Sequence, residues 1–377
     1  MKRLFIIVAM AGLGLVACTK NEVVPSASEQ QEIIFADPVS HVVTKVNLIT
    51  GNYPAAEANK FSVFADYHKA VYATAKASAS NFTAYMRGDN PGYEGVDVTY
   101  KTNTVTMNGK TFNQYWAPAK TYYWPKEGYL TFAAYSPAEA KNHAEISYSV
   151  ENGVSISSYV VKTDLTNQYD FMLSNRVTDQ QSTTMTVDGP YDGVQLEFSH
   201  VLSAIDFTVK TDDNYKTDSY TITLQSITIQ NAFTAGTLTQ FAGFTPDAVN
   251  LAAIWSGQTT EGSYQVPNTS AVEITSTQKA ITPETDIADL VLLPQRLAHT
   301  ATGESNKKVQ AVVAYTVSHP DMGGASIPYT ATLDLSGATG GKWEAGKRYT
   351  YNISIGMEKV VFAPKVNTWT NGGGGDF

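Results

Sequence analysis

Short runs of β-branched and aromatic residues recur along the chain from Glu32 onward, separated by Gly, Pro, Asn and Asp. Such runs, bounded by turn-forming residues, are typical of β-strands. Several alternate strictly between apolar and polar positions, as half-buried antiparallel strands do. One run keeps its alternation only if a one-residue offset is allowed at Gln225-Ser226, which predicts a β-bulge. The predicted strands are 33–35, 61–65, 96–100, 129–135, 195–198, 205–209, 220–229, 309–317, 329–335 and 349–355.

Few segments favour a helix. Residues 70–80 are rich in Ala but have no apolar stripe at helical spacing, so we expect an irregular crossing there. Residues 137–141 and 246–254 carry Pro near a first turn, which predicts one or two helical turns in each. Two halves with similar numbers of strand-like runs predict an all-β chain of two tandem β-sandwiches.

The domain boundary is expected between Gly189 and Asp212, where the first set of strands ends. We therefore predict an N-terminal β-sandwich domain over residues 32–200 and a C-terminal β-sandwich domain over residues 201–377.

Composition supports this fold class and excludes one class of partner. Only 16% of the 377 residues are charged, against about 25% in an average globular domain. Asp and Glu number 35 and Lys and Arg 26, so the net charge is −9. A surface of this sign does not attract phosphate backbones, and we expect no nucleic-acid partner.

The N-terminus reads as an export signal. Lys2 and Arg3 precede an apolar run over residues 5–17. That run is shorter than the roughly 20 residues that span a membrane, and it has the length of a signal-peptide core. We predict a lipoprotein signal peptide over residues 1–17; an ordinary secretory signal is the alternative.

The run ends in Leu15-Val16-Ala17-Cys18, which looks like a lipobox, and Cys18 is the only Cys of the chain. We predict that Cys18 is lipidated, with palmitate among its acyl groups, and that residues 18–31 form a flexible tether. More than one acyl chain on this residue is enough for lasting membrane attachment.

No recognisable catalytic or metal-binding pattern occurs. The six His residues lie far apart, and a single Cys excludes a structural zinc site of the usual type. The acidic group at residues 212–218 lacks the central Gly and terminal Glu of an EF-hand, so a solvated turn is favoured. We expect no catalytic residue, no metal and no cofactor, and a protein that is not an enzyme.

Four aromatic residues lie close together at Trp116, Tyr122, Tyr123 and Trp124. They suit two interpretations, an exposed platform that stacks on sugar rings and an ordinary apolar core with a turn. The core interpretation is favoured.

Several motifs together carry a resemblance to a known family. They are the lipobox at Cys18, Phe61-Ser62-Val63-Phe64, Tyr122-Tyr123-Trp124-Pro125, Phe132-Ala133-Ala134-Tyr135-Ser136-Pro137, Asp170-Phe171-Met172-Leu173-Ser174, Leu196-Glu197-Phe198-Ser199-His200-Val201-Leu202-Ser203, Leu292-Leu293-Pro294-Gln295, Trp343-Glu344-Ala345-Gly346-Lys347-Arg348-Tyr349-Thr350-Tyr351 and Val366-Asn367-Thr368-Trp369. In order and spacing they resemble the fimbrillin-like lipoproteins of Bacteroidales, the family of type V pilus subunits.

The resemblance implies two transthyretin-like (Greek-key) β-sandwiches and a structural, adhesive subunit of a cell-surface fimbria. Its implied partners are other pilin subunits, the outer membrane through the lipid anchor, and a host or bacterial surface ligand. The alternative is a lipid-anchored surface glycan-binding protein that uses the aromatic platform.

In pilus-forming members a protease removes the lipidated N-terminal segment with its first strand, and a strand from a neighbour fills the groove by β-strand addition. On this resemblance Ile33, Ile34 and Phe35 form the candidate exchanged strand. The family protease cuts after Arg, but this chain has no Arg between Arg3 and Arg87. The candidate processing site is therefore Lys45.

The best candidate for a donated strand is the segment 357–369. Pro364 within it interrupts ladder bonding, which weakens that role and favours an edge strand. Without cleavage the protein keeps its lipid and acts as an anchor or a free-standing surface lipoprotein.

Overall fold

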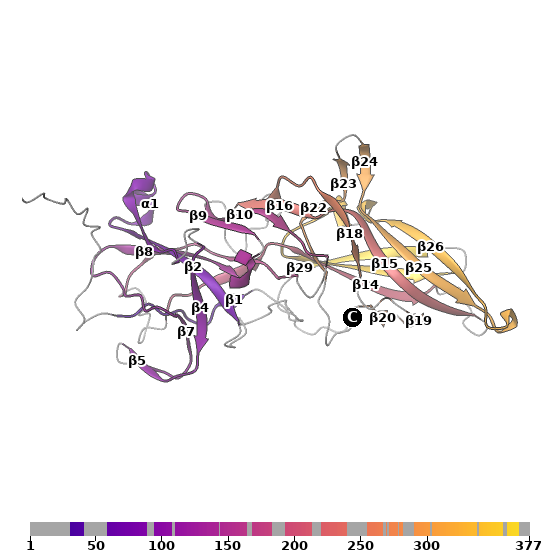
Figure 1. Cartoon of the computed structure of the whole chain (residues 1–377), viewed down its shortest axis with the longest axis horizontal. Helices are drawn as coiled ribbons and strands as arrows, with labels where there is room; N and C mark the ends of the chain where they lie inside the picture. Colours follow the sequence, from indigo (N-terminus) through magenta and orange to yellow (C-terminus); the bar gives the residue numbers. More distant parts are fainter. Residues whose placement is uncertain are drawn as a thin grey trace, which may run out of the picture.

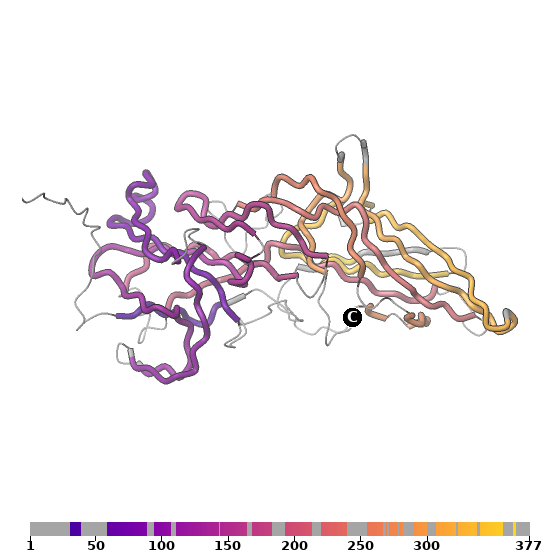
Figure 2. Tube along the Cα trace, viewed as in Figure 1, coloured from indigo at the N-terminus to yellow at the C-terminus, as the bar shows by residue number. Residues whose placement is uncertain are grey.

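The computed structural model describes residues 31–40, 59–88, 94–107, 110–142, 144–163, 168–182, 193–212, 220–239, 255–266, 269, 271–277, 279–281, 290–301, 304–337, 339–356 and 360–368. Within these ranges almost all regular structure is β-strand, which confirms the expected all-β class. The molecule is elongated, with the N-terminal strands at one end and the C-terminal strands at the other (Figures 1 and 2). No helix in the described ranges is long and apolar enough to cross a membrane.

The N-terminal part is built on a nine-stranded sheet with the order β1-β13-β11-β8-β2-β4-β7, while β12 pairs with β8 and β3 with β2. The strands are β1 (Val39–Ser40), β2 (Lys60–His68), β3 (Phe82–Met86), β4 (Val96–Lys101), β7 (Tyr115–Pro118), β8 (Tyr129–Ser136), β11 (Met172–Ser174), β12 (Val177–Gln180) and β13 (Glu197–His200). The hairpin β5 (Val105–Met107) and β6 (Lys110–Phe112) connects β4 to β7. The inward residues of this sheet form one apolar cluster around Phe61, Trp116 and Phe132.

In the part of the chain that the structure describes, helical turns are few and short. They are α1 (Tyr72–Ala75), η1 (Ala79–Asn81), η2 (Ala138–Asn142), η5 (Pro320–Met322), η6 (Leu335–Gly337) and η7 (Thr339–Gly341). The turn expected at residues 137–141 is confirmed by η2, whereas the entirely irregular crossing expected at residues 70–80 is wrong because it contains α1. The carboxylate of Asp179 accepts a hydrogen bond from the backbone N–H of Tyr72 at 2.5 Å, which satisfies the N-terminus of α1 from a distant strand.

Two five-stranded sheets form the C-terminal sandwich. One has the order β20-β14-β28-β29 with β21 on β14, and the other β18-β15-β25-β26 with β19 on β15. The strands are β14 (Ser203–Thr211), β15 (Thr221–Phe233), β18 (Glu261–Gln265), β19 (Val272–Ile274), β20 (Lys279–Ala280), β21 (Leu290–Leu292), β25 (Gln310–Ser318), β26 (Ser326–Asp334), β28 (Lys347–Ile355) and β29 (Val360–Thr368). The β15–β25 register shifts between Leu224 and Ser226, so the predicted bulge is confirmed.

A four-stranded sheet joins the two ends of the molecule. Its order is β17-β16-β10-β9, with β9 (Glu145–Ser149), β10 (Gly153–Val160), β16 (Ala235–Thr239) and β17 (Trp255–Ser256). Two further pairs, β22 (Gln295–Arg296) with β27 (Lys342–Trp343) and β23 (Ala298–Ala301) with β24 (Glu304–Lys308), lie beside it. Strands from both sides of residue 200 therefore share one sheet. The division at residue 200 and the transthyretin-like topology stay predictions.

Candidate functional site

Two of the predicted site residues, Cys18 and Lys45, lie outside the described residues. Within the described ranges the candidate site is the segment 31–40, which contains Ile33, Ile34 and Phe35. The regular strand predicted at residues 33–35 is wrong: the segment is extended and makes isolated β-bridges at Glu32 and Phe35, and the first strand, β1, begins at Val39.

This segment is bonded to β7 and the turn that follows it. The backbone N–H of Phe35 donates to the carbonyl of Trp116 at 2.9 Å, and that of Ile33 donates to the carbonyl of Tyr122 at 2.8 Å. The indole N–H of Trp116 also donates to the Asp37 carboxylate at 3.2 Å. One edge of the segment is thus satisfied by the β7 side of the sheet.

The opposite edge is bonded to the chain that leads into β13. The N–H of Val194 donates to the carbonyl of Ile34 at 2.9 Å, and the N–H of Ala36 donates back to the carbonyl of Val194 at 3.1 Å. Three residues later β1 pairs with β13 in a parallel ladder. Because β7 and β13 belong to opposite ends of the nine-stranded sheet, the segment closes the gap between them.

All three apolar side chains of the segment are buried. Ile33 is 2% exposed, Ile34 1% and Phe35 1%. The ring of Phe35 meets two other rings edge to face, with centroids 5.8 Å from Phe61 and 5.9 Å from Phe132. Burial of consecutive residues means that both faces of the segment are covered, as in a central strand.

The aromatic cluster belongs to this core. Trp116 is 0% exposed and Trp124 3%, which confirms the core interpretation for the two Trp residues and removes their indoles as a platform for glycan binding, while Tyr122 and Tyr123 are half-buried. Trp124 also ties the segment down, because its backbone N–H donates to the carbonyl of Gln31 at 2.9 Å.

Arg87, the first Arg after the segment 31–40, makes side-chain contacts that stabilise the fold. The Arg87 guanidinium pairs with Asp66, whose side chain is 1% exposed, and it lies 4.5 Å from the centroid of the Tyr148 ring. Burial raises the pKa of the Asp66 carboxyl above its usual value, and the Arg87 charge opposes that rise. Arg87 is therefore a poor protease site. Lys60, the other basic residue near the segment, opens β2 opposite Thr99.

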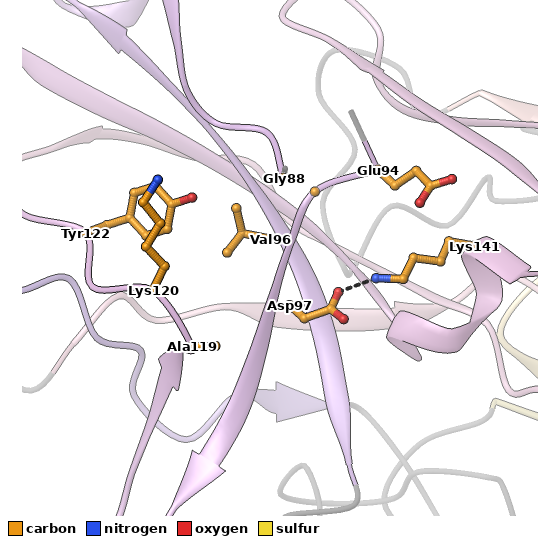
Figure 3. Close-up of a pocket in the computed structure, with 9 residues that line it drawn as sticks. Gly88, Glu94, Val96, Asp97, Ala119, Lys120, Tyr122 and Lys141 are labelled. Carbon is orange, nitrogen blue, oxygen red and sulfur yellow. Dashed lines mark hydrogen bonds and ion pairs between the residues drawn. The ribbon is translucent and has the colours of Figure 1, made fainter. Parts of the chain in front are cut away.

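A cavity of about 320 Å³ lies beside β4, lined in part by Tyr122 and Lys120 on one side and by Asp97 and Lys141 on the other (Figure 3). Asp97 accepts from Lys141 Nζ at 2.7 Å and from the hydroxyl of Ser62 at 2.7 Å. The cavity holds an ion pair that is already satisfied, and its described lining residues include no nucleophile paired with a base.

The candidate donor segment 357–369 contains β29, which is an edge strand, as Pro364 predicted. In the described ranges β29 pairs with β28 alone, and Pro364 stands opposite Tyr351. The sequence also contains a signal that lies outside the family motifs given above. Val360-Val361-Phe362-Ala363 repeats the chemistry of Ile33-Ile34-Phe35-Ala36 position by position.

Comparison with known proteins agrees with this architecture. The chain is similar over most of its length to a fimbrial protein from Bacteroides vulgatus, with 17% identity and a TM-score of 0.57, over 90% of this chain and 100% of the other. It is also similar to the tip fimbrial protein Mfa3 from Porphyromonas gingivalis, with 11% identity and a TM-score of 0.33, over 84% and 95% of the two chains. No curated protein matches it. The model of the fimbrillin-like family matches residues 56–369, which include most of the described strands, and the chain belongs to that family.

Proposed function

We propose that the protein is a structural and adhesive fimbrial subunit, exported as a lipoprotein through Cys18, that assembles by exchange of its first strand. Cleavage near Lys45 would release residues 18–45. The observation that carries the proposal is the segment 31–36, which is hydrogen-bonded on both edges and whose residues 33–35 are buried. Such a strand leaves a groove rather than a smooth surface when it is removed.

Binding of a strand in the empty groove is strongly favourable in free energy. Five backbone hydrogen bonds tie the segment to its two neighbours, and each contributes about 0.5–1.5 kcal/mol net. Burial of three large apolar side chains adds about 1.5–3 kcal/mol each, as an upper estimate. The total is on the order of 10 kcal/mol, which is comparable with the whole stability of a typical domain. A chain without this strand gains greatly by binding another.

The best occupant is the segment 360–363 of a second copy. Its sequence puts β-branched residues at the positions of Ile33 and Ile34, with Phe362 at the position of Phe35. The same alignment places Pro364 at Asp37, and the Asp37 N–H makes no backbone hydrogen bond with any residue in the described ranges. Pro364 lacks a backbone N–H, but no backbone hydrogen bond is lost at this position of the groove. The Pro is therefore compatible with donation of this segment.

The test is to express residues 46–377 and to measure mass by light scattering beside the full chain. We expect multimers from the shortened chain and a monomer from the full chain. A synthetic peptide of residues 30–40 in excess should occupy the groove and keep the shortened chain monomeric, which separates strand exchange from nonspecific aggregation.

Two variants of the shortened chain locate the donor. Phe362→Asp should abolish the multimers, because a carboxylate cannot enter the pocket of Phe35. Val366→Asp places the same charge in the same strand, outside the repeated sequence and at a side chain that is 42% exposed, and it should leave them intact. A folded 46–377 monomer that never assembles would refute the proposal.

A further inference from the structure

One face of the C-terminal sandwich carries almost no charge. Strands β15, β25 and β26 lie side by side in one of its two sheets (Figure 1). Buried and accessible residues alternate along β15 and β25, so one face of this sheet packs inward and the other is open. We call the open face of residues 221–230, 310–318 and 326–334 the neutral face. Asp334, at the end of β26, is the one charged residue in these ranges, and Glu273 of β19 lies at their border, beside β15.

The centre of the neutral face is apolar. Val312 and Ala314 lie at outward positions of the middle strand, and both are half-buried. In the strand register Thr228 and Thr332 flank Val312, and Ala314 likewise lies between two hydroxyl side chains. Such small side chains give a flat surface of the kind that packs on another sheet. An apolar centre that is depleted of charge is the compositional signal of a protein interface.

The other sheet of the same sandwich has a different outer face. Lys210 of β14 and Arg348 of β28 both occupy outward positions there. Arg348 Nη1 donates to the carboxylate of Asp206, in the same face, at 2.6 Å. Covering that face with a partner would remove several charges from water, which costs free energy. The neutral face can be covered without that cost, so the two outer faces differ in what they can bind.

The net charge of the chain indicates which partner suits the neutral face. At −9, the chain repels other copies of itself and attracts basic partners. A basic partner gains most where the acidic side chains are, and a face without charge offers it no attraction. A partner of the same sign approaches closely only where like charges do not meet. A second copy of this chain is such a partner.

We propose that the neutral face binds the neutral face of a second copy, in a two-fold contact that joins subunits side by side. The contact uses neither the groove of the segment 31–36 nor β29, which lies in the other sheet, so it is independent of strand exchange.

The size of the neutral face predicts a weak contact. At the usual strand spacings, three strands of this length cover about 14 by 30 Å, or about 400 Å² on each copy. A standard interface buries about 800 Å² on each partner, so a single pair of copies associates weakly. Copies held in a row present many such contacts at once and associate more firmly. The contact is therefore suited to joining arrays of subunits rather than to forming a stable free dimer.

Sedimentation equilibrium of the full, uncleaved chain tests the contact, because in that form the segment 31–36 fills its own groove. We expect a monomer at about 10 µM and a growing fraction of dimer toward about 1 mM. The association should hold or strengthen as NaCl is raised, since salt screens the repulsion between two acidic chains and the contact contains no ion pair.

Charge variants locate the contact. Val312→Glu brings two carboxylates together near the two-fold axis and should weaken the association by about tenfold or more. Thr228→Glu, in the same row of the sheet, should do the same and replaces a polar residue instead of an apolar one. The matched control is Ser354→Glu, which adds the same charge at an outward position of β28, in the other sheet, and should leave the association unchanged.

A chain that remains monomeric up to about 1 mM would overturn the inference. So would association that weakens with salt, because ion pairs would then hold it. Association that both Val312→Glu and Thr228→Glu leave unchanged would place the contact on another surface, and equal weakening by Ser354→Glu would show only the effect of net charge. Because the full chain is used throughout, these results are independent of whether residues 46–377 form multimers.

Discussion

Replacing Phe35 by Ala tests whether the first strand holds the N-terminal core together. The ring is 1% exposed and meets Phe61 and Phe132 edge to face, at 5.8 and 5.9 Å. Phe35→Ala removes the apolar burial of the ring and leaves a cavity between two rings that backbone hydrogen bonds hold in place.

We expect the substitution to lower the free energy of unfolding by about 3–5 kcal/mol. Each edge-to-face ring contact accounts for about 0.5–1.5 kcal/mol of that loss. Against a typical domain stability of about 5–15 kcal/mol, the change is large enough to separate the unfolding of the N-terminal part from the rest.

Urea unfolding followed by tryptophan fluorescence measures this loss. The ring centroid of Trp116 lies 5.4 Å from that of Phe61, which Phe35 also contacts, so its fluorescence reports on this cluster. Tyr329→Ala is the control. That ring lies in β26, is 39% exposed and stacks only on Tyr315 among the ring contacts of the described residues, so its loss should cost about 0.5–1.5 kcal/mol. A loss below about 1 kcal/mol for Phe35→Ala would refute the view that the segment is a required part of the core.

Three further predictions concern other parts of the chain. Phe207→Ala should cost about 3–5 kcal/mol in chemical denaturation, since the ring is 0% exposed and stacks on Tyr351 at 5.5 Å; a cost under about 1 kcal/mol would contradict its burial. Arg87→Met leaves the Asp66 carboxylate buried without its partner and should cost about 3–5 kcal/mol near neutral pH. Because burial already raises the pKa of Asp66, the folded variant takes up a proton more readily than the unfolded one. Its deficit relative to the unmodified chain should therefore shrink as pH falls, and a deficit independent of pH would exclude this cause. Cys18→Ala should abolish membrane attachment and metabolic labelling by palmitate, and undiminished labelling would rule out lipidation at that residue.

Local periodicity carried most of the fold prediction. The alternation at residues 96–100 predicted a strand that the structure shows as β4, and the offset at Gln225-Ser226 became a real register shift. Both signals are visible in the sequence because the side-chain period of a strand is 2 and any interruption of it must be absorbed locally.

Features that depend on distant residues were not predictable in this way. The helix α1 lacks a side-chain cap of its own, and its N-terminus is satisfied by Asp179, which is 107 residues away. A cavity where β17 meets the β22–β27 pair likewise combines residues from β17, β22, β23 and β27, which no spacing brings together. The repeat of residues 33–36 at 360–363 was visible in the sequence, but its meaning depends on the structure, in which residues 33–35 are buried and bonded to both neighbouring segments.

On the proposed assembly, each subunit receives a strand in its N-terminal groove and gives one from its C-terminal edge. Tension along such a fibre passes through the middle of every subunit, so a bare linker there would be the weakest point. This chain instead crosses the middle with the β17-β16-β10-β9 sheet, in which β10 of one end pairs with β16 of the other. The apolar core also continues across it, from Phe64 and Tyr135 to Phe207 and Tyr351. Load therefore falls on several hydrogen bonds and on packed side chains at once, which is what a structural subunit requires of its centre.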